Sequence, residues 1–204
     1  MLQIKIRGHD LILNTHPQLF SPNGLDRGTL AMLSVVQFQV GQRVLDLGCG
    51  YGAVGILAAK LVGAENVVMV DNDPLAVQVS KENLVLNRVS HVTVCQSNGF
   101  SNLRESNFDL ILSNPPYHTD FSVPKEFIEK GFNRLVIGGK MYMVTKRKEW
   151  YKNKFIAIFG GVRVCEVDGY YVFMAEKKSV RYASSKKGRI REGRISTSNR
   201  IVKK

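Results

Sequence analysis

Cysteine is scarce in this sequence and occurs in no pattern that is typical of a metal site. Three cysteines, Cys49, Cys95 and Cys165, are spread over 204 residues. Their odd number argues against a framework of disulfides, and their separations do not match the spacing of zinc ligands. We therefore expect reduced, buried thiols in a cytoplasmic protein, and no bound metal.

Long apolar runs are also missing. No stretch reaches the roughly 18 consecutive apolar residues that span a bilayer. The first six residues alternate between apolar and polar side chains as a strand does, and they lack the apolar region of a signal peptide. We expect no membrane contact, and the composition does not indicate an oligomeric state.

Acidic residues are nearly absent from the last part of the chain. Residues 177–204 contain eleven Lys and Arg but one acid, Glu192, so they hold +10 of the net charge of +12. Such a segment buries too little apolar surface to fold, and it is suited to a polyanion. We predict one folded domain over residues 1–176, and a disordered basic tail over residues 177–204 that contacts RNA phosphates.

The folded part has a repeating pattern of strands and helices. After two short strands at 4–6 and 10–13 and a helix at 26–38 with Asp26 as N-cap, strands are expected at 43–46, 66–71, 91–95, 108–113 and 140–145. Helices are expected at 52–61, 74–87, 123–135 and 149–159. The final strands, 162–167 and 170–176, flank Asp168-Gly169, a strong signal for a tight antiparallel hairpin. The pattern predicts a Rossmann-like α/β fold, with helices on both faces of a mostly parallel seven-stranded sheet that has one antiparallel strand.

A glycine-rich segment follows the first strand of this pattern. Gly48, Gly50 and Gly52 let the backbone approach a ligand closely, and the helix that they open offers free N–H groups. The string from Gly50 also fits the G-x-G-x-x-G dinucleotide fingerprint, with Asp71 about 20 residues further on. Asp46 favours a different ligand, because its charge repels a pyrophosphate and attracts the sulfonium and ammonium groups of S-adenosylmethionine.

The segment Asn114-Pro115-Pro116-Tyr117 follows the fourth strand, opposite the glycine-rich segment. An exocyclic amine on a base or amide is a poor nucleophile, because its lone pair is delocalised. An Asn oxygen and a backbone carbonyl held between prolines can accept both amine hydrogens and direct the lone pair at a methyl group. Tyr117 offers a face on which a planar base can stack. These four residues are therefore predicted to be catalytic.

The glycine-rich segment resembles motif I of the class I S-adenosylmethionine-dependent methyltransferases. This resemblance implies that Asp71 hydrogen-bonds the cofactor ribose and that Asn98, after the third strand, contacts the adenine edge. Asn72, beside Asp71, is expected to belong to the same cofactor-binding set.

Residues 20–29, FSPNGLDRGT, together with the two segments above, resemble the small-domain methyltransferase family. Its best-known members, the C-type enzymes, methylate the guanine exocyclic amine (N2) in small-subunit ribosomal RNA. The resemblance implies the same activity here, with Phe20 and Thr29 at the mouth of the cofactor pocket and Asn114 to Tyr117 around the base.

Three alternatives remain open from the sequence. The same motif serves adenine N6 in RNA or DNA, and it serves the glutamine amide in protein substrates of the release-factor type. A non-enzymatic RNA-binding module is also conceivable, although the complete set of Asp46, Asp71 and Asn114 argues against it.

Overall fold

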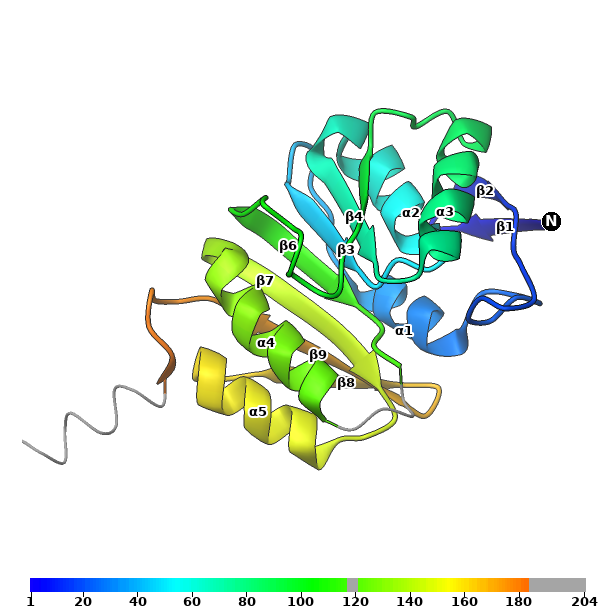
Figure 1. The fold of residues 1–204 in the computed structure, drawn as a ribbon. Helices are drawn as coiled ribbons and strands as arrows, with labels where there is room; N and C mark the ends of the chain where they lie inside the picture. The colour runs from blue at the N-terminus through cyan, green and yellow to red at the C-terminus, as the bar shows by residue number, and fades with distance from the viewer. Residues whose placement is uncertain (117–120, 184–204) are drawn as a thin grey trace, which may run out of the picture.

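A computed structural model describes residues 1–116 and 121–183 of the chain (Figure 1). In this part the main sheet has seven strands, in the spatial order β5-β4-β3-β6-β7-β9-β8. They are β3 (Val44–Leu47), β4 (Val67–Asp71), β5 (Thr93–Gln96), β6 (Phe108–Ser113), β7 (Leu135–Thr145), β8 (Arg163–Val167) and β9 (Tyr170–Glu176). Strand β9 is antiparallel to β7 and β8, whereas the pairs among β5, β4, β3, β6 and β7 are parallel. The predicted Rossmann-like sheet is confirmed.

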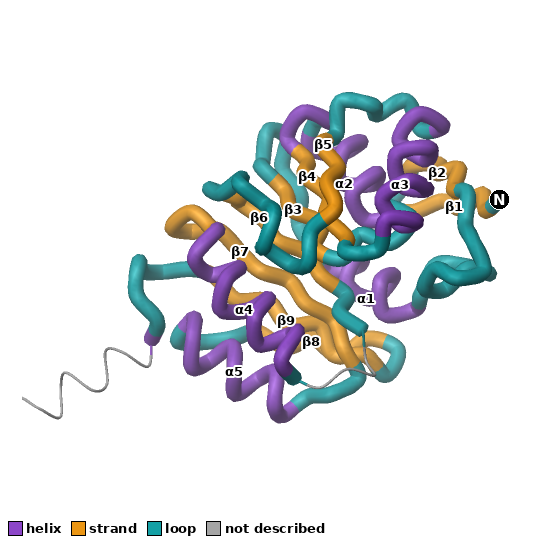
Figure 2. The backbone as a smooth tube through the Cα atoms, in the orientation of Figure 1, coloured by secondary structure: helices purple, strands orange, loops and turns teal. Residues whose placement is uncertain are grey.

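Helices cover both faces of the sheet, as Figures 1 and 2 show. One hydrophobic cluster joins the sheet to α1 (Arg27–Val35), α2 (Ala53–Val62) and α3 (Pro74–Leu86), with the short 3-10 helix η1 (Ala64–Asn66) after α2. A second cluster on the other face involves α4 (Ser122–Arg134) and α5 (Glu149–Phe159). No helix in the described residues is long and apolar enough to cross a bilayer.

The N-terminal hairpin, β1 (Leu2–Ile6) and β2 (His9–Leu13), is a separate sheet that docks on α3. Two buried amides at α3 imitate a neighbouring strand: Asn87 bonds both the N–H and the carbonyl of Ile12, and Asn83 does the same for Asn14. Asn83 also donates to the carbonyl oxygen of Tyr51 at 2.8 Å. One side chain therefore connects the hairpin to the glycine-rich segment.

Strand β7 begins at Leu135, five residues earlier than predicted. The pair Gly138-Gly139 lies inside the strand as an irregularity, and the register shifts opposite Phe108 and Leu110. Gly138 has a φ of 85°, and a Cβ on Gly139 would lie 2.9 Å from the Phe108 carbonyl oxygen. The glycines therefore permit a bulge and a close backbone approach, as glycines inside strands often do.

The closing hairpin is as predicted. Asp168 and Gly169 both have positive φ values, 50° and 77°, as a tight two-residue turn requires. Strand β9 is inserted between β7 and β8, which confirms the expected antiparallel strand.

The predicted basic tail differs from expectation at its beginning, because Lys177 is buried rather than disordered. Its ammonium group donates to the carbonyl oxygen of Leu135 at 2.7 Å and lies 5.0 Å from the centre of the Phe132 ring. Burial lowers the pKa of Lys177.

Tyr182 continues this packing. Its hydroxyl donates to the carbonyl oxygen of Glu129 at 3.0 Å, and its ring meets the Phe132 ring edge to face. The apolar surface of α4 thus orders the chain beyond Glu176. The rest of the predicted tail, residues 184–204, lies outside the described residues.

Candidate active site

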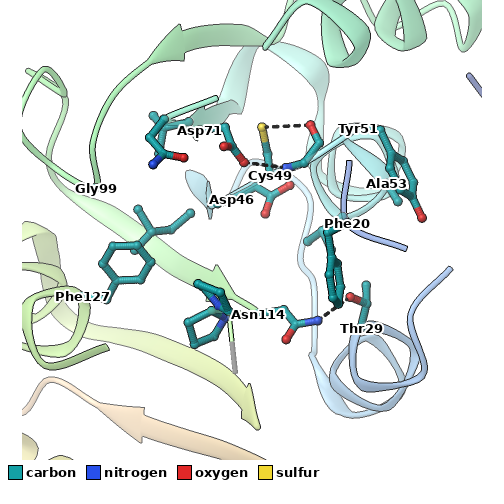
Figure 3. Close-up of a pocket in the computed structure, with 18 of the residues that line it drawn as sticks. Phe20, Thr29, Asp46, Cys49, Tyr51, Ala53, Asp71, Gly99, Asn114 and Phe127 are labelled. Carbon is teal, nitrogen blue, oxygen red and sulfur yellow. Dashed lines mark hydrogen bonds between the residues drawn. The ribbon is translucent and has the colours of Figure 1, made fainter. Parts of the chain in front are cut away.

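The site lies where the strand order reverses. Strands β3 and β6 are parallel neighbours, but the chain runs outward from them in opposite directions, and such a switch point is where α/β sheets bind ligands. The Ser113 hydroxyl donates to the Leu47 carbonyl oxygen at 2.8 Å and joins the two strand ends. A cavity of about 330 Å³ opens at this point, within the size range of small-molecule pockets, about 300–1,000 Å³ (Figure 3).

Most of the predicted site residues line this cavity. From the predicted cofactor set these are Phe20, Thr29, Asp46, Gly48, Gly50, Asp71, Asn72 and Asn98. From the predicted catalytic set these are Asn114, Pro115 and Pro116. Tyr117 lies outside the described residues.

Gly52 does not line the cavity. It is the N-cap of α2, with a φ of 94°, and a Cβ there would lie 2.8 Å from Met69 Cε and 3.2 Å from Ser80 Cβ. Its contribution is therefore conformational: glycine allows the positive φ with which α2 begins, and it leaves room for the side chains of Met69 and Ser80.

Gly48 and Gly50 are the glycines of this segment that line the cavity. Both have positive φ, 80° and 54°, and a Cβ built on either meets no atom within 4 Å. The backbone therefore borders open space that side chains would fill. The N–H of Gly50 donates to the Asp71 carboxylate at 2.8 Å, which fixes the segment against the end of β4.

Asp46 is a buried carboxyl at the end of β3, exposed by 3%. It accepts a hydrogen bond from the N–H of Gly55 at 2.9 Å. Burial raises its pKa from the ordinary 3.8 to about 7; the Gly55 hydrogen bond opposes this shift and the charge of Asp71 adds to it. A carboxyl in this state is stabilised in its charged form by a cationic ligand.

Gly55, the last glycine of the G-x-G-x-x-G string, packs against the sheet and does not line the cavity. A Cβ there would lie 2.5 Å from both Cγ and Sδ of Met69, so α2 packs on β4 at a distance that glycine allows.

Asp71, at the end of β4, is half-buried and shapes the loops around it. Its carboxylate accepts from the N–H of Gly50 at 2.8 Å and from the N–H of Asp73 at 3.1 Å. A carboxylate has about four acceptor positions, so Asp71 retains capacity for hydroxyl donors. Asp73 accepts from the N–H of Leu75 and is the N-cap of α3.

Asn114 is connected to α1. Its amide nitrogen donates to the Asp26 carboxylate at 2.8 Å and to the Thr29 hydroxyl at 2.9 Å, the latter visible in Figure 3. The same Asp26 oxygen accepts from the N–H of Thr29 at 2.8 Å and caps the helix. An ionised carboxylate cannot donate, so the nitrogen end of the amide must face α1 and the oxygen end must face away from it.

Asp26 was predicted from the sequence only as an N-cap, because helix-start signals are local. Its bond to Asn114 joins residues 88 positions apart, which no spacing rule indicates.

Two phenylalanines add aromatic surface to the cavity wall. Phe20 is 56% exposed although it lines the cavity, so it lies at the mouth and not in the core. Phe127, from α4, lines the cavity and packs edge to face on Phe100. Sequence reasoning missed Phe127, because a helical apolar face predicts burial without saying against what.

A family model described as "Methyltransferase small domain" matches residues 10–174. The chain belongs to this family. It is thus an S-adenosylmethionine-dependent methyltransferase domain, and Gly48, Gly50, Asp46 and Asp71 all line its cavity.

Individual relatives of this methyltransferase domain act on ribosomal RNA, by their names. The "Ribosomal RNA large subunit methyltransferase G" of Yersinia pestis (strain Pestoides F) is 31% identical over 185 residues, covering 87% of this chain and 46% of the relative. A solved structure titled "T. Thermophilus 16S rRNA N2 G1207 methyltransferase (RsmC) in complex with AdoMet and Guanosine" is 28% identical with a TM-score of 0.79, covering 87% of this chain and 50% of that one. TrmN from Thermus thermophilus, 24% identical with a TM-score of 0.66 over 77% of this chain and 51% of that one, shares the fold. The chain spans about half the length of the curated relatives that it matches.

Proposed function

We propose that this domain methylates an exocyclic amine of a base in RNA, with guanine N2 of small-subunit ribosomal RNA as the first acceptor to test. The observation that carries the proposal is the oriented amide of Asn114, held by Asp26 and Thr29 at the border of a cavity shared with Asp46 and Asp71. The Thermus thermophilus structure, whose title names AdoMet and guanosine, supports the choice of guanine.

Cofactor binding is assigned to the carboxyl ends of β3, β4 and β5. Gly48 and Gly50 admit the ligand close to the backbone, and Asp46 supplies negative charge for its sulfonium and ammonium groups. Asp71, with Asn72 beside it, binds the ribose hydroxyls, and Asn98 reaches the adenine edge. When bound, the cofactor supplies an electrophilic methyl group.

Acceptor binding is assigned to the end of β6. The Asn114 side-chain oxygen and the Pro115 carbonyl accept the two amine hydrogens, which directs the nitrogen lone pair toward the methyl donor. The prolines fix the direction of that carbonyl, because φ is locked in each. Alignment and charge placement account for most of the rate gain in such a site. Tyr117 is proposed to stack on the base.

A transfer assay tests this proposal. The chain is incubated with radiolabelled S-adenosylmethionine and one of three substrates: small subunits, large subunits or protein-free ribosomal RNA. All three are prepared from cells that lack this protein, and the labelled nucleotide is then mapped. Label on guanine N2 of the small subunit supports the full proposal. Label on the large subunit, which the name of the Yersinia relative suggests, corrects the target. Label on adenine N6 or on a protein glutamine would favour the alternative acceptors.

Cofactor affinity is expected to rise with pH. The Asp46 carboxyl has a pKa of about 7 without ligand, and a cationic ligand favours its charged form, so the dissociation constant should fall roughly tenfold between about pH 6 and pH 8. Isothermal titration measures this. In Asp46→Asn the affinity should be weaker and nearly independent of pH, and a flat profile in the unsubstituted protein would contradict the assignment of Asp46.

The same carboxyl sets the sign of a stability effect. Its pKa is higher in the folded than in the unfolded chain, so the cofactor-free domain should lose stability as pH rises from about 4 to about 7. This slope should be smaller in Asp46→Asn.

The basic tail is proposed to bind RNA phosphates. Because Lys177 and Tyr182 pack on α4, the informative truncation removes residues 184–204 only. We expect unchanged folding and cofactor affinity. The slope of log K for RNA against log salt should become shallower by about 0.7 for every phosphate that the tail neutralises in the full chain. If the slope is the same with and without these residues, the tail is not an RNA anchor.

A further inference from the structure

Positive charge is concentrated in one part of the domain itself. Residues 130–165 contain nine Lys and Arg and a single acid, Glu149, whereas the rest of residues 1–176 contains nine Lys and Arg and fifteen acids. Some of these cations have structural partners: Lys130 pairs with Glu126, and Lys154 pairs with Glu129. The longest basic run of the domain consists of Lys146, Arg147 and Lys148, and we call it the basic ridge. Its cations form no ion pair with the described residues.

The basic ridge lies at the catalytic end of the sheet. It directly follows Thr145, the last residue of β7, and β7 runs parallel to β6 with Met143 opposite Ser113. The carboxyl ends of parallel neighbours meet at one edge, so the ridge shares the edge that holds Asn114.

Arg147 also contacts the helix that forms a wall of the cavity. It lies 5.1 Å from the centre of the Phe121 ring, at the N-cap of α4, and Phe121 stacks on Trp150 with ring centres 4.3 Å apart. Further along α4, Phe127 lines the cavity.

Aromatic rings hold the ridge without neutralising it. Lys146 lies 5.0 Å from the centre of the Tyr170 ring, and Lys148 lies 5.1 Å from that of Tyr171. All three cations are exposed, and none makes an ion pair with a described residue. Cation–π contacts orient a side chain while its charge stays available to an anion.

The acids around the ridge leave it positive. Glu149 follows it in the first turn of α5, where the helix dipole stabilises a carboxylate. Across the sheet edge, exposed Glu166 and Asp168 belong to β8 and its turn. None of these acids lies within ion-pair distance of a ridge cation in the described structure.

We propose that the basic ridge binds the phosphates that flank the target nucleotide of the RNA substrate. The inference rests on the proposed function. An enzyme that acts on a base within structured RNA must take that base out of its stack, and anchoring the adjacent backbone holds the displaced nucleotide at the cavity. The cations already cover the neighbouring rings, so the ridge is suited to phosphate contact and not to base stacking.

The test compares two triple variants of equal charge change in the full chain. The ridge variant replaces Lys146, Arg147 and Lys148 by Gln. The matched control replaces three exposed cations elsewhere in the domain by Gln: Lys5, Lys81 and Arg104. Thermal unfolding and S-adenosylmethionine titration verify that both variants fold and bind cofactor.

Binding is measured with a fluorescein-labelled single-stranded RNA of mixed sequence across a salt series. The ridge variant should reduce the slope of log K against log salt by about 2, since each of the three cations accounts for about 0.7. The control should leave the slope nearly unchanged. Replacing Lys146 and Lys148 by Arg should preserve the slope, because charge and not side-chain identity is needed.

Methyl transfer to ribosomal RNA separates this inference from the proposed function. If the unsubstituted chain methylates RNA and the ridge variant shows a raised KM with a similar kcat, the ridge is the phosphate site. If the two triple variants have the same salt slope for RNA binding and the same KM, the proposal that the basic ridge binds phosphates is overturned. Absence of transfer by the unsubstituted chain to any RNA would instead overturn the proposed function.

Discussion

Asn114→Ala should bind S-adenosylmethionine with nearly normal affinity but transfer the methyl group at least about a hundredfold more slowly, as expected when one oriented transition-state partner is removed. The side-chain oxygen of Asn114 is the acceptor that holds the amine. Asp26 and Thr29 fix its orientation by accepting hydrogen bonds from the amide nitrogen. Alanine removes that acceptor. The cofactor contacts assigned to β3, β4 and β5 stay in place.

Single-turnover transfer and isothermal titration of the same preparation check this expectation. Titration shows that the variant is folded, so a slow turnover cannot be attributed to unfolding. Turnover close to that of the unsubstituted chain would mean that the amine is held elsewhere, and the assignment of the Asn-Pro-Pro segment would fail.

Asp26→Ala is expected to lower kcat by at least about tenfold, although Asp26 is assigned no contact with either substrate. The carboxylate only accepts and so favours the nitrogen end of the Asn114 amide, whereas the Thr29 hydroxyl can donate or accept. Loss of the carboxylate therefore favours a flipped amide more than before, and a flipped amide presents N–H groups to the amine. The substitution also removes the N-cap of α1, at a stability cost of about 1 kcal/mol.

Asp73→Ala is the matched control for removal of the cap. Asp73 caps α3 in the same way, by accepting from Leu75, but it does not line the cavity. It should reproduce the decrease in stability without the decrease in kcat. Asp26→Asn, which keeps an acceptor for both bonds, should recover part of the activity. Equal kcat values in Asp26→Ala and Asp73→Ala would show that Asp26 acts only as a helix cap and does not orient Asn114.

The two loops of the site were predicted from sequence because their chemistry is local. Gly48 and Gly50 adopt positive φ, which glycine allows without strain, and Pro115 and Pro116 have φ fixed by their rings. The alternation of strands and helices placed these loops at the same edge of the sheet. Gly52 shows the limit of this reasoning, because a motif glycine can serve the helix turn and not the ligand.

The sequence by itself determined the strand and helix types, the sheet class, the closing hairpin and eleven of the residues that line the cavity, since periodicity and backbone stereochemistry act over a few residues. Only the tertiary structure decided that Asp26 orients Asn114, that Phe127 forms a cavity wall, that Lys177 is buried, and that the basic ridge shares the catalytic edge. These features depend on strand order and helix packing, which bring together residues far apart in the chain, and no local pattern specifies which distant side chain a given group will meet.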